Sequence, residues 1–171
     1  MAAGGGLLPT AAARHADAWS LACADAHRMF VRRTHKLARL QGKTPVAWDE
    51  VFDLFGGEAT VGDTDGLHPS TIIQQWRWSW DHLPRTRAIT GAGLRLLWMV
   101  DTTWYLDQKQ ETWASMAAVD ICEGLSPQQC KLVLGGGAAM WGEKVDASNI
   151  VQTIFPRLAA VAEALWSCTH F

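Results

Sequence analysis

Aromatic and acidic side chains gather at the ends of several short apolar segments of this 171-residue sequence. The residues of these types that could meet a ligand are Trp48, Trp76, Tyr105, Asp107, Trp141 and Glu143. An indole is a large flat apolar surface with one N–H donor, which suits stacking against a ligand face, whereas phenol and carboxylate groups hydrogen-bond polar groups. These residue types together indicate a binding pocket with apolar walls and a few polar contacts.

The alternative role for each indole is core packing. The sequence holds ten Trp but only five Phe and one Tyr. Trp48, Trp76 and Trp141 each precede polar or acidic residues, which favours a pocket over a core. A surface carboxylate is the alternative for Glu143. Tyr105 would share one side of an extended segment with the residue two positions later, Asp107. Structural roles are expected for Trp78, Trp80, Trp98 and Trp166.

Composition excludes several classes of protein. A content of 49% apolar and 19% charged residues is typical of a globular domain, and a net charge of -2 gives no field that attracts nucleic acid or an anionic membrane surface. The sequence contains no run of about 18 apolar residues, the length that would predict a membrane-spanning helix. The cysteines lack zinc-ligand spacing, so we expect no metal or other cofactor, and Cys122 and Cys130 are either one disulfide or two free thiols.

The sequence predicts one folded domain over 17–171, after an Ala/Gly-rich flexible tail over 1–16 that does not resemble a signal peptide. An amphipathic helix is predicted over 17–40, with a basic cluster that is read as a solvated face rather than a nucleic-acid site. Strands are predicted over 44–48, 70–76, 94–100 and 131–134, and a closing helix over 156–167.

Strands that alternate with helices or long connections predict right-handed βαβ units and a parallel sheet. The predicted fold class is α/β: about four β/α units, the C-terminal half of a (β/α)8 TIM barrel. In such barrels, ligands bind at the carboxyl ends of the strands, where the aromatic and acidic residues above lie. A half barrel would also expose two sheet edges and apolar inner faces, which predicts self-association.

Three segments carry a more specific signal: 48–53 (Trp-Asp-Glu-Val-Phe-Asp), 104–107 (Trp-Tyr-Leu-Asp) and 135–146, which begins Gly-Gly-Gly-Ala-Ala-Met-Trp-Gly-Glu. With the closing segment 152–167, they resemble the plant-like β-N-acetylhexosaminidases of glycoside hydrolase family 20, over about residues 24–167. The resemblance implies a retaining glycosidase that removes terminal N-acetylglucosamine or N-acetylgalactosamine from glycans. The 2-acetamido oxygen of the sugar itself serves as the nucleophile.

The resemblance also implies roles for individual residues. Tyr105 would hydrogen-bond the acetamido oxygen, Glu143 would bind the distal hydroxyls of the sugar, and Asp107 would lie at the pocket rim. The walls around the acetamido methyl group and the sugar ring would come from Trp48, Trp76 and Trp141, with Trp113 as a further wall residue. The implied partner is a glycan. Members of the family are lysosomal, vacuolar or extracellular, and the location of this chain stays open.

The sequence departs from the family in its acid. Nothing matches the His-x-Gly-Gly-Asp-Glu segment that carries the general acid, or the family's substrate-clamping Arg. Asp49 and Glu50, on a segment expected to be extended, would point to opposite faces and could not flank one bond. We therefore expect a fragment of a longer barrel that is inactive alone. The alternative is a non-catalytic half barrel that binds sugar or self-associates, and the preferred amino sugar and linkage stay open.

Overall fold

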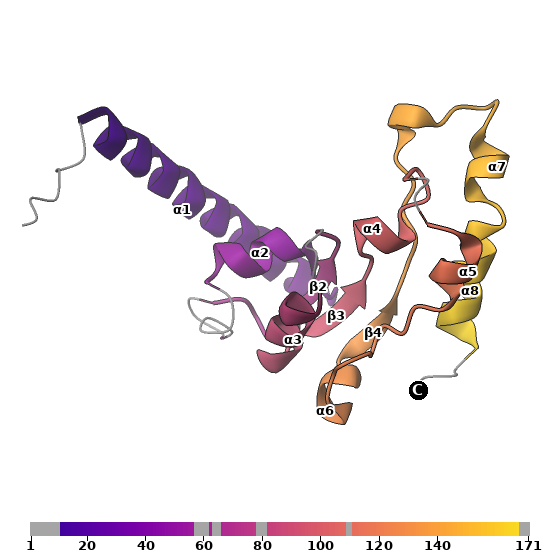
Figure 1. The fold of residues 1–171 in the computed structure, drawn as a ribbon. Helices are drawn as coiled ribbons and strands as arrows, with labels where there is room; N and C mark the ends of the chain where they lie inside the picture. Colours follow the sequence, from indigo (N-terminus) through magenta and orange to yellow (C-terminus); the bar gives the residue numbers. More distant parts are fainter. Residues whose placement is uncertain (1–10, 57–61, 63–65, 78–81, 109–110, 168–171) are drawn as a thin grey trace, which may run out of the picture.

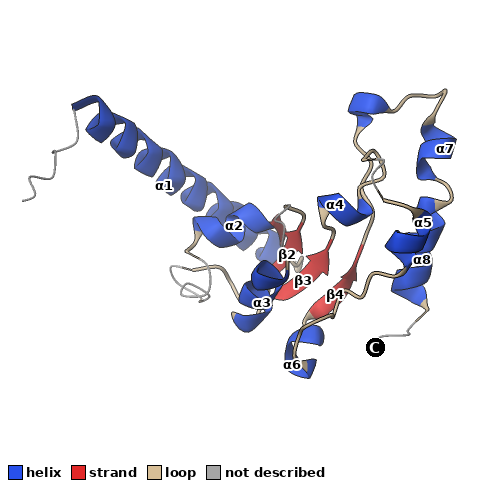
Figure 2. Ribbon diagram, viewed as in Figure 1, coloured by secondary structure: helices blue, strands red, loops and turns tan. Residues whose placement is uncertain are grey.

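The computed structural model describes residues 11–56, 62, 66–77, 82–108 and 111–167. A long helix, α1, leads into a small sheet whose strands are separated by helices and connections (Figures 1 and 2). In chain order the elements are α1 (Ala11–Leu40), β1 (Val46–Trp48), α2 (Asp49–Leu54), β2 (Ile72–Gln75), α3 (Leu83–Gly91), β3 (Arg95–Trp98), α4 (Asp101–Trp104), α5 (Trp113–Ala117), α6 (Pro127–Cys130), β4 (Val133–Gly136), η2 (Gly142–Lys144), α7 (Ile150–Ile154) and α8 (Arg157–Trp166).

The four strands form one parallel sheet in the order β1-β2-β3-β4. Ile73 lies opposite Ala47 on β1 and Leu96 on β3, and Leu96 lies opposite Val133 on β4. The pairing of β3 with β4 shifts by one residue after Leu96. The parallel sheet predicted from the sequence is therefore confirmed; β1, β2 and β3 are shorter than predicted, and β4 has the predicted length but begins two residues later.

Alternate strand residues face the core on one side of the sheet. Ile73, Leu96 and Trp98 are buried there, and α3 packs on β3. The Trp98 ring meets the Trp104 ring edge to face, with the ring centroids 4.9 Å apart. The Trp104 indole N–H donates to the backbone oxygen of Met116, 3.2 Å away, so its single donor is satisfied inside the core. This pair connects the sheet to the segment that follows β3.

A buried amide connects β2 to α3. The Gln75 side chain donates from Nε2 to the backbone oxygen of His82 at 3.0 Å, and its Oε1 accepts from the Thr86 hydroxyl at 2.8 Å. Because both ends of this buried amide are paired, its burial carries no unsatisfied group. The first turn of α3 is thereby fixed against the carboxyl end of β2.

On the opposite face of the sheet, apolar side chains are exposed among the described residues. Val46 on β1 is 50% exposed and Leu134 on β4 is 48% exposed. Parallel sheets are normally covered on both faces, so it is unusual that apolar residues are exposed on one face and that β1 and β4 pair with no further strand in the described part of the chain. Association between copies through these edges stays a prediction.

Several details of the chain differ from, or add to, the sequence-based expectations. Helix α1 begins at Ala11, six residues before the predicted start. Cys122 and Cys130 form a disulfide, which decides between the two alternatives for this pair. Trp98 is buried as expected, but Trp166 is 83% exposed, so its predicted packing role is wrong for this chain. Trp78 and Trp80 lie outside the described residues. No helix in the described ranges is both long and apolar enough to cross a membrane.

Gly136 gives a direct test of the packing under the sheet. A Cβ atom there would lie 2.1 Å from the backbone oxygen of Trp98 and 2.7 Å from the ring atom Cζ3 of Trp104. We expect Gly136→Ala to lower the free energy of unfolding by about 1–3 kcal/mol, because the core must shift to admit the methyl group. Urea denaturation followed by circular dichroism measures this, with Gly142→Ala as the control, since a Cβ at Gly142 meets no atom within 4 Å. Equal stability of the two variants would contradict the packing described.

Candidate functional site

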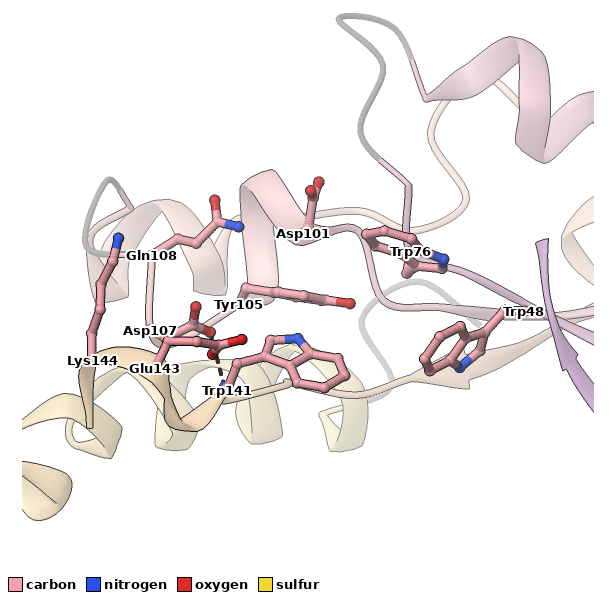
Figure 3. A pocket seen from close by; sticks show the side chains of 9 residues that line it. All are labelled: Trp48, Trp76, Asp101, Tyr105, Asp107, Gln108, Trp141, Glu143 and Lys144. Carbon is pink, nitrogen blue, oxygen red and sulfur yellow. Dashed lines mark hydrogen bonds between the residues drawn. The ribbon is translucent and has the colours of Figure 1, made fainter. Parts of the chain in front are cut away.

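A hollow of about 800 Å³ lies at the carboxyl ends of the strands (Figure 3). This volume falls within the range of roughly 300–1,000 Å³ that is usual for small-molecule sites. Its lining combines three indoles with a phenol, three carboxylates, an amide and an amine. The lining residues are Trp48, Trp76, Asp101, Tyr105, Asp107, Gln108, Trp141, Glu143 and Lys144.

Parallel pairing brings the three indoles together. Trp48 is the last residue of β1, Trp76 directly follows β2, and Trp141 follows the segment that leaves β4. Because neighbouring parallel strands end at the same edge of the sheet, these side chains meet there despite separations of 28 and 65 residues in sequence. The Trp48 and Trp76 ring centroids lie 6.1 Å apart with an interplanar angle of 56°.

Tyr105 reaches the pocket by a route that the sequence did not predict. An extended segment was considered only for Tyr105 and Asp107, and the residues before them, 101–104, form the helical turn α4. Tyr105 then pairs in a parallel bridge with Ala139, and the Leu106 N–H donates to the Ala139 oxygen at 2.7 Å. In Figure 3 the Tyr105 hydroxyl points toward the space between the three indoles.

The electrostatic surroundings keep the Tyr105 phenol protonated. Burial raises the pKa of its hydroxyl above the ordinary value, and the nearby carboxylates of Asp101, Asp107 and Glu50 act in the same direction, while a hydrogen bond with Trp141 opposes them. A protonated phenol can donate a hydrogen bond to a ligand carbonyl. Burial likewise raises the pKa of Asp101.

Asp107 and Glu143 come from two neighbouring segments. The Asp107 carboxylate accepts a hydrogen bond of 3.2 Å from the backbone N–H of Trp141, which joins the turn after Tyr105 to the segment after β4. Glu143 lies in the short 3-10 helix η2, next to Lys144. Glu143 and Trp141 thus enter the pocket from one segment, and Asp107 supports that segment from the side.

The acidic pair after β1 is helical, not extended as predicted. Helix α2 begins at Asp49, directly after Trp48, and its first turn sends the two carboxylates to different partners. The Trp76 indole N–H donates to both Glu50 oxygens, at 3.1 and 2.9 Å. Asp49 instead accepts from Arg77 Nε at 3.0 Å. The two carboxylates diverge as predicted, but because of the helical turn and not because the segment is extended. Neither of them lines the pocket.

Asp49 is fully buried, and burial raises the pKa of its carboxyl from 3.8 to about 6. The guanidinium groups of Arg77 and Arg85 oppose this effect, and the charge on Glu50 adds to it. Asp49 Oδ2 has no hydrogen-bond partner among the described residues, since its ion pair with Arg85 Nε spans 3.5 Å. A half-satisfied buried carboxylate of this kind favours its neutral form.

Not every residue assigned by resemblance reaches the pocket. Trp113 lies outside the lining: it is the first residue of α5 and is 58% exposed, so its assignment as a wall residue has no geometric support in this chain. Sequence reasoning also missed Asp101, Gln108 and Lys144. Asp101 could have been found as the first polar residue after the apolar run of β3. In the described part of the chain, no cluster of His, Cys, Asp or Glu could hold a metal ion.

The chain resembles known proteins in sequence. Residues 9–169 match the model of glycosyl hydrolase family 20, catalytic domain. The chain is 36% identical over 144 residues to beta-hexosaminidase 1 of Arabidopsis thaliana, which covers 84% of this chain and 24% of that protein. It is 39% identical over 127 residues to the beta-hexosaminidase subunit alpha of Rattus norvegicus, covering 71% and 22%.

Solved structures agree on the fold. An exo-β-N-acetylglucosaminidase from Vibrio harveyi in complex with N-acetylglucosamine aligns with a TM-score of 0.64 at 21% identity, over 83% of this chain and 23% of that one. The β-N-acetylhexosaminidase of Streptomyces coelicolor aligns with a TM-score of 0.62 at 22% identity, over 83% and 30%. The chain is a partial TIM barrel, with four of its parallel strands.

This chain therefore belongs to glycosyl hydrolase family 20, within the catalytic domain of the β-hexosaminidases. It spans about a quarter of the length of the curated relatives that it matches. The family assignment and the partial barrel, both predicted from the sequence, are confirmed.

Asp49 predicts a pH dependence of stability. Between pH 4 and 6 the folded chain holds a proton on this carboxyl that the unfolded chain has lost, so the contribution of Asp49 to the free energy of unfolding falls as the pH rises. Relative to Asp49→Asn, the unaltered chain should lose about 2 kcal/mol of stability between pH 4 and pH 7. Urea denaturation of both proteins at the two pH values checks this. A difference between them that does not change with pH would contradict the raised pKa.

Proposed function

We propose that this chain binds the terminal N-acetylhexosamine of a glycan in the pocket at the strand ends, and that this pocket is one part of a β-N-acetylhexosaminidase active site. The observation that carries the proposal is the convergence of the Tyr105 hydroxyl with three indoles from separate strand ends. Flat apolar rings suit the C–H faces of a sugar and an acetamido methyl group, and the phenol supplies a donor for the acetamido oxygen.

In the family's reaction the acetamido oxygen attacks the anomeric carbon and forms an oxazoline, while the bond to the leaving oxygen breaks and an acid protonates that oxygen. Water then opens the oxazoline with retention of configuration. In this proposal, Tyr105 orients the acetamido oxygen and hydrogen-bonds it as charge develops. The carboxylate of Glu143 accepts hydrogen bonds from the distal hydroxyls, and Asp107 contributes at the rim.

Two features support a sugar as the ligand. The related enzyme from Vibrio harveyi, which shares the fold, is described in complex with N-acetylglucosamine. Four polar residues of the pocket, Asp107, Gln108, Glu143 and Lys144, lie together at one end, and Trp48 and Trp76 lie at the other (Figure 3). A ligand with one apolar face and a row of hydroxyl groups matches this division.

In this proposal, catalysis requires a general acid that this chain does not supply. The described pocket holds the acetamido-orienting phenol, but the sequence lacks the family's His-x-Gly-Gly-Asp-Glu acid segment. General acid catalysis contributes about 10²- to 10⁴-fold to rates of this kind. We infer that the isolated chain binds the sugar without hydrolysing it, and that the acid comes from the remainder of a family 20 barrel.

Binding is tested by titrating the purified chain with N-acetylglucosamine and with glucose, which lacks the acetamido group, while the Trp fluorescence is recorded. We expect tighter binding of N-acetylglucosamine. Tyr105→Phe should weaken that binding by roughly 2- to 12-fold, the value of one hydrogen bond, and leave glucose binding unchanged. Equal affinity for the two sugars would contradict the acetamido site.

The inference about catalysis is tested with an aryl N-acetylglucosaminide, which releases a coloured phenol on hydrolysis. We expect no release by the isolated chain above the buffer rate, since the sequence lacks the family's acid segment. The comparison variant is Asp101→Asn, which removes a half-buried pocket carboxylate of raised pKa. Release by the unaltered chain that Asp101→Asn abolishes would contradict the inference and assign the acid to Asp101.

A further inference from the structure

Glu50 is an acidic residue next to the pocket that the proposed reaction does not use. Its carboxylate lies outside the pocket lining, but both of its oxygens accept from the Trp76 indole N–H, at 3.1 and 2.9 Å. Hydrogen bonds to an ionised acceptor are stronger than those between neutral groups. An indole has one donor only, so this contact uses the entire hydrogen-bonding capacity of the Trp76 ring.

Two other contacts of Trp76 are a backbone hydrogen bond and a neighbouring ring. Its backbone oxygen accepts from the Asp101 N–H at 3.0 Å, which fixes the main chain against the exit of β3. The nearest ring is Trp48, but an interplanar angle of 56° at 6.1 Å is not a stacked arrangement that would set the plane of both indoles. The hydrogen bond to Glu50 favours the ring orientation that keeps the Trp76 N–H directed at the carboxylate.

Arg77, the residue after Trp76, fixes the distance between Trp76 and the helix that carries Glu50. Arg77 donates from Nε to Asp49 at 3.0 Å and from Nη2 to Asp53 at 2.5 Å, so it binds the same first turns of α2 that carry Glu50. Arg85 reaches Asp53 as well, at 2.9 Å. The ion pairs fasten α2 to the β2 exit, and Glu50 completes the connection at the indole.

We propose that Glu50 is a positioning residue for the sugar site: through its two hydrogen bonds it orients the Trp76 ring so that the indole face forms a preset wall of the pocket. This inference rests on the proposed function. If the Trp76 side chain is already ordered in the free chain, ligand binding does not carry the entropy cost of ordering it. The carboxylate itself touches no ligand.

The experiment labels the chain with ¹⁵N and follows the indole Nε1–H resonances, with Trp76 assigned by its loss in Trp76→Phe. Glu50→Ala should shift the Trp76 resonance and weaken N-acetylglucosamine binding by roughly 2- to 12-fold, the effect of ordering one side chain. Glu50→Gln, which keeps an acceptor, should bind within about twofold of the unaltered chain. If Glu50→Ala does not fold, Glu50→Asp takes its place in the experiment. It keeps the charge but shortens the side chain, and it should shift the Trp76 resonance and weaken binding in the same way.

The matched control is Glu163→Ala, which removes an exposed helical carboxylate of α8 outside the pocket lining and should change neither readout. In the Trp76→Phe background, Glu50→Ala should have no further effect on binding, because phenyl has no N–H to donate. An unmoved Trp76 resonance in Glu50→Ala, or an equal loss of binding in both backgrounds, would overturn the inference. If the unaltered chain binds no N-acetylglucosamine, the proposed function fails, while the resonance still decides whether Glu50 orients Trp76.

Discussion

Parallel pairing of the four strands is the constraint on which the position of each pocket residue depends. In an antiparallel sheet, consecutive strand ends alternate between opposite edges, and the side chains that follow β1 would lie at the edge opposite to those that follow β2 and β4. Here all four strands run the same way in sequential order, so their exits share one edge. The register adds precision: Trp48 lies opposite Gln74 on β2, which places Trp76 two residues beyond the end of β1. The pocket is a consequence of this sheet geometry before any side-chain contact is considered.

Short structures after each strand then turn the side chains into the hollow. Helix α2 begins directly after Trp48 and delivers Asp49 and Glu50 to the next strand exit, where they meet an arginine and an indole. The single turn of α4 carries the chain across to the β4 side, where Tyr105 pairs beside Ala139. These turns serve two purposes at once, because each connects neighbouring exits and aims a functional side chain. The buried Asp49 shows the energetic cost of that arrangement, since its carboxyl is only partly satisfied.

Much of this arrangement could be predicted from the sequence, and the failures have physical causes. Short apolar runs bounded by Gly and Pro predicted the strands, and the rule for parallel strand ends then brought Trp48, Trp76 and Trp141 together correctly. The helix after Trp48 was missed because its residues include Val51 and Phe52, which suit strands as well, whereas ion pairs with arginines 28 and 32 residues later decide the conformation. Trp113 was assigned by resemblance to the family, and it lies outside the pocket lining because it begins α5, where it is 58% exposed. The choice between a disulfide and two thiols at Cys122 depended on a loop conformation that spacing does not reveal.

The central claim is that an acetamido sugar contacts the indoles of separate strand ends at the same time. The direct measurement is the set of intermolecular nuclear Overhauser effects between the acetamido methyl protons of N-acetylglucosamine and the aromatic protons of the chain. The account predicts contacts from this methyl group to the rings of Trp48, Trp76 and Trp141, which share the lining of one pocket. Contacts to the exposed Trp113 or Trp166 instead, or to one pocket indole without the others, would contradict it.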